Sequence, residues 1–325
     1  MSILTRDPKT ARGRARPRSG GAARGQRYLD PKVIARIGNL QILARTVVEG
    51  FVSGLHRSPF LGRSMDFAEY RSYLPGDDLR QIDWKLYSRS DRYFVKQFEG
   101  DTNTNVTVIL DASASMDYAG PEGAENAVSK LEYGKFLAAS LGYMAQRQRD
   151  RIGLFVVDEG VRTMVANGAK QLDIVLHQLE TTEAAGTTDL NGALDAIAGG
   201  VRRRGIVALV SDLYLSSDEV IEAVGKLRLR GLDVVVFHVL HPTEIRLAFD
   251  DTVEVEDRET GRAMAIEPDV LRERYEQRVR RHIADLGTGL GRVGVDYQLI
   301  TTDEPLDRAL HRYLASRLWS MKSRN

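Results

Sequence analysis

The stretch Val106–Met116 reads VTVILDASASM. An apolar run rich in β-branched residues stops at Asp111, and two serines, Ser113 and Ser115, follow at alternate positions. Such a run predicts a strand buried on both faces of a sheet. The polar side chains that follow it would lie at the carboxyl end of that strand, where we expect Asp111 to face solvent.

Strand-like and helix-like patterns alternate from residue 105 onward. Strands are expected at 106–113, 151–158, 161–166, 205–213, 232–240 and 295–302, and helices at 127–148, 169–180, 190–203, 217–230 and 268–287. This alternation predicts an α/β domain over 105–325, with a mostly parallel, Rossmann-like sheet covered by helices on both faces. DEG at 158–160 predicts a hairpin and therefore one antiparallel edge strand, and a second hairpin is expected within 253–266.

The segment before the sheet, residues 28–104, begins with a predicted helix. Asp30 can cap this helix and Pro31 can take its first position, and apolar residues continue at helical spacing towards Gly54, which is expected to end it. Further along, GDDLRQIDWK at 76–85 is expected to form a turn and a short helical piece anchored by Trp84.

Residues 1–27 differ in composition from the rest of the chain. They hold eight Lys or Arg residues and one acidic residue, Asp7, whereas the whole chain has a formal charge of +1. With few large apolar residues, this arm is expected to be a disordered tail. Contact with nucleic acid through the arm remains an alternative.

Composition and motifs narrow the class of protein. Cysteine is absent, which excludes disulfides and thiolate chemistry. The longest apolar run is too short to span a bilayer, and no secretory pattern is present, so a soluble, cytoplasmic protein is expected. Phosphate-binding loops and common hydrolase motifs are also missing, which favours a protein that is not an enzyme.

Side chains that carry oxygen atoms follow two predicted strands and precede one predicted helix. They are Asp111, Ser113 and Ser115 after the first strand, Thr187 and Thr188 in AAGTTDLNGAL (184–194), and Asp212 at the end of 205–213. In a parallel sheet, ligands bind beyond the carboxyl ends of the strands. Alternate spacing in an extended loop would send the first three side chains to one side. Oxygen ligands without sulfur or imidazole predict a hard cation, Mg²⁺ or Mn²⁺.

The patterns VILDASASM, GTTDLNGAL and ALVSDL, taken together, resemble the von Willebrand factor type A domain and its metal-ion-dependent adhesion site. The resemblance implies that five residues hold the ion: Asp111, Ser113, Ser115, Thr188 and Asp212. Thr188 is preferred to Thr187 because the family pattern is Gly-x-Thr and Thr188 is the second residue after Gly186. Three neutral hydroxyls would leave the ion under-neutralised and with one coordination position open, which a Glu or Asp of a partner protein can fill.

The segment EYRSYLPGDDLRQIDWKLYSRSDRYFVKQFE (69–99), followed by such a domain, resembles the bacterial family called domain of unknown function 58. The resemblance extends from about residue 28 to the C-terminus. It implies an adaptor for a MoxR-type AAA+ ATPase, acting in the assembly or maturation of protein complexes. The client and the role of the basic arm are not implied.

An enzymatic alternative uses the same residues. Asp111 could serve a metal-dependent phosphohydrolase as nucleophile or metal ligand. No general base is recognisable for that reaction, and hydroxyl ligands are poorly suited to generating a metal hydroxide. His238 lies on a predicted strand near the site and is interpreted as a packing residue. Metal-dependent protein binding is therefore the favoured prediction.

Overall fold

The structure is a computed structural model that describes residues 30–55, 70–72, 93–96, 104–121, 127–200, 205–247, 253–256, 263–266 and 268–312. Its centre is a six-stranded sheet with the strand order β10-β7-β6-β3-β4-β5. The strands are β3 (Asn105–Asp111), β4 (Arg151–Val157), β5 (Val161–Gly168), β6 (Ile206–Ser211), β7 (Asp233–Leu240) and β10 (Asp296–Thr301). Five strands are parallel, and β5 alone in this sheet runs antiparallel to its neighbour, β4. The predicted α/β fold with one antiparallel edge strand is confirmed.

The central strands are buried along almost their whole length. In β3 all residues from Val106 to Asp111 are buried, as are all six residues of β6. The runs of valine, isoleucine and leucine that predicted these strands occupy this interior, because both sheet faces are covered. The three strands β4, β3 and β6 are in register, so their carboxyl ends meet at one edge.

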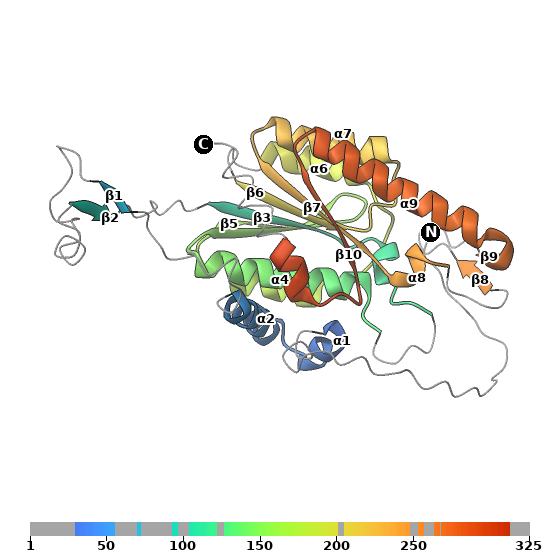
Figure 1. Cartoon of the computed structure of the whole chain (residues 1–325), viewed down its shortest axis with the longest axis horizontal. Helices are drawn as coiled ribbons and strands as arrows, with labels where there is room; N and C mark the ends of the chain where they lie inside the picture. The colour runs from blue at the N-terminus through green and yellow to red at the C-terminus, as the bar shows by residue number, and fades with distance from the viewer. Residues whose placement is uncertain are drawn as a thin grey trace. The chain divides into compact units, whose positions relative to one another are not determined.

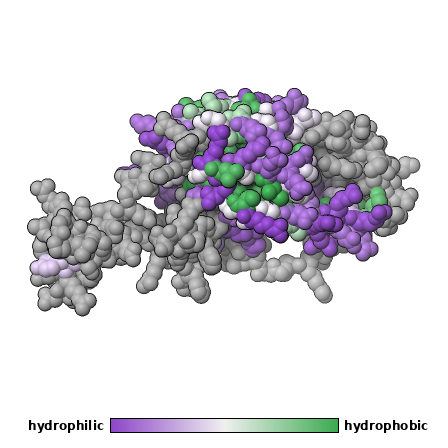
Figure 2. Space-filling view, turned by 90° about the horizontal axis from the view of Figure 1, so that it is seen from above, coloured by the Kyte–Doolittle hydropathy of each residue, from purple (hydrophilic) through white to green (hydrophobic). Residues whose placement is uncertain are grey.

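Helices cover both faces of the sheet (Figure 1). The long helices that follow β3 are α4 (Lys130–Arg147), α5 (Leu172–Thr181), α6 (Leu190–Gly200), α7 (Ser217–Leu229) and α9 (Pro268–Arg292). In Figure 1, α4 lies below the sheet, and α6, α7 and α9 lie above it. The face seen from above is mainly hydrophilic, with a smaller apolar area in its middle (Figure 2). The apolar stripes of α6, α7 and α9 are buried beneath this face and form one core with the sheet.

The predicted N-terminal helix is interrupted. The chain forms α1 (Pro31–Ile34), a 3₁₀ turn η2 (Ala35–Ile37) and then α2 (Leu40–Leu55). The break lies at Gly38, whose φ of 64° is left-handed and costs a glycine little. Asn39 then begins α2, because its side chain accepts a hydrogen bond from the Ile42 N–H at 2.9 Å. The expected cap at Asp30 is present, accepting from the Lys32 N–H at 2.9 Å, but Gly54 lies inside α2 and does not end it.

The contacts divide the chain into two compact units, residues 50–103 and the remainder. Within the smaller unit the structure describes a short antiparallel pair, β1 (Tyr70–Ser72) and β2 (Phe94–Lys96). Trp84 and the basic arm 1–27 lie outside the described residues. The second predicted hairpin is confirmed as β8 (Val253–Glu256) paired with β9 (Ala263–Ile266). Among the described helices, none is long and apolar enough to cross a membrane.

Candidate metal-binding site

Asp111 lies at the carboxyl end of β3 with no exposed surface. One of its oxygens, Oδ1, accepts a hydrogen bond from the Ser113 N–H at 2.9 Å, and Oδ2 accepts one from the Ser211 hydroxyl at 2.6 Å. The parallel pairing of β3 with β6 brings Ser211 beside Asp111. The expectation that Asp111 faces solvent was wrong, because the flanking strands and the turn after β3 enclose its carboxylate.

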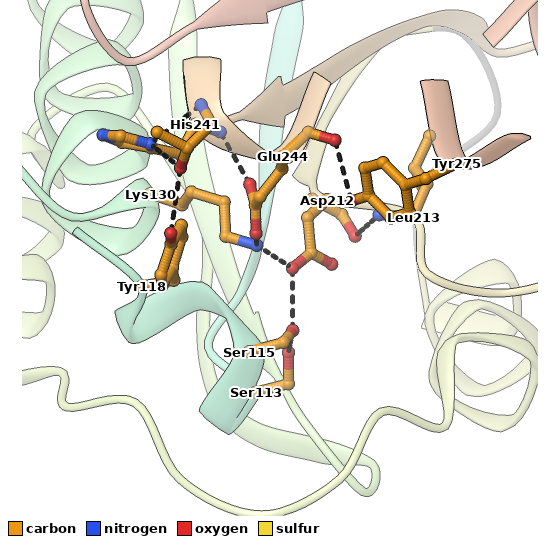
Figure 3. Close-up of polar contacts among 11 residues, drawn as sticks. Ser113, Ser115, Tyr118, Lys130, Asp212, Leu213, His241, Glu244 and Tyr275 are labelled. Carbon is orange, nitrogen blue, oxygen red and sulfur yellow. Dashed lines mark hydrogen bonds and ion pairs between the residues drawn. The ribbon is translucent and has the colours of Figure 1, made fainter. Parts of the chain in front are cut away.

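Ser113 and Ser115 are brought together by a 3₁₀ turn, η4 (Ala114–Asp117), rather than by the extended loop that we expected. Their hydroxyl oxygens are 3.1 Å apart, and the Ser115 hydroxyl donates to Asp212 Oδ2 at 2.7 Å. Figure 3 shows the two serines stacked beneath the Asp212 carboxylate. The turn tightens the chain after Ser113, so the side chains still converge although the backbone is not extended.

Thr188 belongs to the loop that leads into α6. Three backbone hydrogen bonds fix this loop: Ala114 N–H to the Gly186 carbonyl (3.0 Å), Ala185 N–H to the Ala112 carbonyl (2.9 Å) and Asp189 N–H to the Asp158 carbonyl (2.9 Å). Gly186 has a φ of 72°, a left-handed conformation that suits glycine. The loop carrying Thr188, which is half-buried, is therefore tied to the segment between Asp111 and Ser115.

The spacing of these oxygens fits a small hard cation. Mg²⁺ bonds of about 2.1 Å at right angles place neighbouring ligand atoms about 3 Å apart. The Ser113–Ser115 and Ser115–Asp212 oxygen pairs are separated by 3.1 and 2.7 Å. Among the described residues, no group of three His, Cys, Asp or Glu side chains could hold a metal ion. A metal would therefore depend on the hydroxyls as well as on the carboxylates.

The sequence reasoning missed a buried lysine at this site. The Lys130 ammonium, at the first position of α4, donates to Asp212 Oδ2 at 2.7 Å and to Glu244 Oε1 at 2.8 Å. Glu244 belongs to α8 (Pro242–Ile245), which follows β7. All three side chains are at most 2% exposed. Asp212 thus shares one oxygen between Ser115 and Lys130 (Figure 3).

Aromatic side chains complete the surroundings of Lys130. The ring centroid of Tyr214 lies 4.6 Å from the ammonium nitrogen, within the range of a cation–π interaction. The Tyr275 hydroxyl, from α9, donates to the Glu244 backbone carbonyl at 2.8 Å, and the hydroxyls of Tyr118 and Thr243 are 2.9 Å apart. These contacts fix α8 to both α9 and the segment after η4.

Burial and charge shift the pKa values of the ionisable groups at this site. Burial, followed by the negative charge of Asp212, raises the pKa of Asp111 to about 6, although hydrogen bonds from Ser211 and Ser113 act in the opposite direction. Burial lowers the pKa of Lys130, but the carboxylates of Asp212 and Glu244 outweigh it, and the net shift is upward. Lys130 is therefore cationic, and Asp111 lacks a positive partner of its own among the described contacts.

One local signal for Lys130 was present in the sequence. The Ser129–Glu132 capping box marks the start of α4 and puts Lys130 in its first turn. A positive charge there opposes the helix dipole, so a lysine at this position indicates a nearby acidic partner. Glu244 is the third helical residue in the capping box of α8, as Glu132 is in that of α4. The pairing of Lys130 with Glu244 joins positions 114 residues apart, which local patterns do not predict.

His238 on β7 is buried, as its interpretation as a packing residue requires. Its Nδ1 lies 2.7 Å from the Tyr297 hydroxyl, while its Nε2 has no hydrogen-bond partner within the described part of the chain. Burial lowers the pKa of His238 to about 3 and keeps the ring neutral near pH 7. It is 1% exposed and so cannot reach a ligand in solvent.

Comparison with known proteins gives one family and several relatives. The family described as "Protein of unknown function DUF58" matches residues 69–285. Uncharacterized proteins of Mycobacterium bovis and Mycobacterium tuberculosis are 26% identical over 295 residues, covering 89% of this chain and 90% of theirs.

The solved structures that match are more distant in sequence. BatB of Bacteroides thetaiotaomicron is 17% identical with a TM-score of 0.45, covering 66% of this chain and 98% of its own. An aerotolerance-related membrane protein of Bacteroides fragilis is 15% identical with a TM-score of 0.42, covering 64% and 97%. The SpRpn10 VWA domain is 7% identical with a TM-score of 0.39, covering 64% and 94%.

Proposed function

This chain belongs to the DUF58 family of proteins of unknown function, and on that premise we propose that it is a metal-dependent protein-interaction protein. The observation that carries the proposal is the convergence of the Ser113, Ser115 and Asp212 oxygens at the carboxyl edge of the sheet. Asp111 is held beside them by two hydrogen bonds, and Thr188 lies in a loop bonded to the same segment.

In this proposal the five residues hold Mg²⁺ or Mn²⁺ through two carboxylates and three neutral hydroxyls. A bound ion would supply a positive contact for a Glu or Asp of a partner protein. The chain's own residues contribute orientation: Ser211 and the Ser113 N–H hold the Asp111 carboxylate, and η4 sets the distance between the two serine hydroxyls. Such a site binds a partner and catalyses no reaction.

The partner that we propose to test first is a MoxR-type AAA+ ATPase from the same organism. The family signature at 69–99 implies such a partner, and the role would be that of an adaptor between the ATPase and a client protein. A client that offers an acidic side chain fits the charge of the site. The basic arm 1–27 has no part in this proposal.

The test compares binding of the ATPase by calorimetry to wild type in Mg²⁺, wild type in EDTA, and Asp111→Asn in Mg²⁺. Asparagine keeps the shape and the acceptor for the Ser113 N–H but removes the charge. We expect both EDTA and the substitution to weaken binding by about 30- to 1000-fold, since a charge-assisted contact is worth about 2–4 kcal/mol. Asp195→Asn, on the exposed side of α6, is the matched control and should bind like wild type.

Affinities that agree within about threefold across all three samples would contradict a metal-dependent contact with that ATPase. The same Asp111→Asn variant tests the enzymatic alternative. Mg²⁺-dependent hydrolysis of p-nitrophenyl phosphate by wild type, lost in Asp111→Asn but kept in Asp195→Asn, would show an enzyme and overturn the proposal.

A further inference from the structure

The carboxylates at the candidate metal site already have one cation, the Lys130 ammonium. It is fully buried, and its hydrogen bonds go to Asp212 Oδ2 at 2.7 Å and Glu244 Oε1 at 2.8 Å. The Tyr214 ring covers a third side, at 4.6 Å from the ring centroid. Two hydrogen bonds to carboxylates and a neighbouring aromatic ring therefore hold the lysine in one place.

The lysine and the candidate metal ligands share an atom. Asp212 Oδ2 accepts both from Lys130 and from the Ser115 hydroxyl, which is itself 3.1 Å from the Ser113 hydroxyl. A cation at the serines and the ammonium of Lys130 thus draw on the same carboxylate. Glu244 accepts a second hydrogen bond from the ammonium, so the lysine keeps one carboxylate partner when another cation binds Asp212 (Figure 3).

The charges of this cluster determine which ion it can take. Three carboxylates, those of Asp111, Asp212 and Glu244, lie with one ammonium in a buried region, which leaves two negative charges when all are ionised. Burying unpaired charge is costly. A divalent cation would bring the cluster to neutrality. Neutral hydroxyl groups without these carboxylates would leave no negative charge for the cation to balance.

We propose that Lys130 is a built-in counter-ion that positions Asp212 and sets the affinity of the site for divalent cations. The inference rests on the proposed metal site and adds a residue that this site's five-residue pattern does not contain. Without the lysine, the site would bind a divalent cation more tightly, because a positive charge beside the shared carboxylate opposes a second one. With it, metal binding is weak enough to depend on what the partner contributes.

The test measures Mg²⁺ and Mn²⁺ binding by calorimetry at about pH 8, without any partner. Lys130→Met alone would leave two buried carboxylates unpaired, so the main variant is Lys130→Met combined with Glu244→Gln, which removes one charge of each sign. We expect this double variant to bind Mg²⁺ about tenfold or more tightly than wild type. Glu244→Gln alone keeps the ammonium and loses a negative charge, so it should bind about tenfold more weakly.

Lys226→Met is the matched control. Lys226 also faces two carboxylates, Asp195 at 3.1 Å and Glu222 at 3.6 Å, but lies on the exposed face of α7. The Lys226→Met substitution should leave the affinity of the protein for Mg²⁺ unchanged. Circular dichroism and melting temperature establish that each variant is folded before it is titrated.

The outcomes separate this inference from the proposed function. If wild type binds Mg²⁺ and the double variant binds no more tightly, the role of Lys130 is overturned and the metal site stands. If wild type shows no binding up to about 20 mM Mg²⁺ but the double variant binds, the counter-ion role is supported, and the comparison of ATPase binding in Mg²⁺ and in EDTA decides the metal-dependent function. If neither binds, the counter-ion role is overturned, and the metal-dependent function is decided by the same comparison of ATPase binding.

Discussion

Helices α4 and α7 begin in the same way and carry similar lysines, yet they belong to different environments. Each starts with a serine and a glutamate in a capping box, Ser129–Glu132 in α4 and Ser216–Glu219 in α7. Each lysine contacts two carboxylates, Asp212 and Glu244 for Lys130, and Asp195 and Glu222 for Lys226. The side chain of Lys130 has no exposed surface, whereas that of Lys226 is 40% exposed.

The difference between the two helices shows that the same pairing has different consequences when water is excluded. Around Lys226, water and salt screen the charges, and long side chains lose entropy when held together, so such pairs contribute little. Around Lys130, each charge depends on the others, because removal of one leaves the rest buried without compensation. The buried cluster also lies where strand ends meet, which is the place for a ligand.

The largest expected effect is on stability when Lys130 is replaced. In EDTA, Lys130→Met should lower the free energy of unfolding by about 3–5 kcal/mol, because Asp212 and Glu244 are left as an unpaired buried pair of like charges. Lys226→Met should leave the urea midpoint nearly unchanged. Urea unfolding followed by circular dichroism measures both variants. Equal midpoints for the two would mean that burial does not distinguish these lysines.

A smaller effect is expected from the buried histidine near the same edge. The pKa of His238 is lowered to about 3, so as pH falls from 7.5 to 4.5 the unfolded chain takes up a proton that the folded chain does not. Stability is therefore lost through His238 as pH falls below about 6.5. His238→Gln should be spared this loss, so the stability of wild type relative to the variant should decrease by about 2–3 kcal/mol between these pH values.

Denaturation at the two pH values measures this difference. His177→Gln, at an exposed position on α5, is the matched substitution. The measurement could show that the difference in unfolding free energy between wild type and variant changes with pH as little for His238→Gln as for His177→Gln. Such a result would show that His238 is protonated in the folded protein at pH 4.5. That result would contradict the interpretation of His238 as a neutral packing residue.

Local patterns predicted the sheet because runs of valine and isoleucine have one stable place, the interior between helices. They also placed Asp111, Ser113, Ser115 and Asp212 at one edge, because parallel strands end together. They did not predict that Ser113 and Ser115 meet through a 3₁₀ turn, nor that Gly38 breaks the first helix, since both depend on short-range backbone geometry with weak sequence signals. Local patterns did not predict the Lys130–Glu244 contact, because only tertiary folding brings those residues together.

The smallest expected effect concerns the two capping boxes. Ser129 is 6% exposed and its hydroxyl accepts from the Glu132 N–H at 3.1 Å, whereas Ser216 is exposed and makes the same bond to Glu219 at 3.3 Å. Ser129→Ala should cost about 1–2 kcal/mol, because water reaches the freed N–H poorly. Ser216→Ala should cost less, because water can replace the lost hydroxyl. Ser129→Thr keeps a hydroxyl, so it should retain most of the stability that Ser129→Ala loses, as measured by urea unfolding. A threonine variant as unstable as the alanine variant would attribute the loss to packing around Ser129 rather than to the cap.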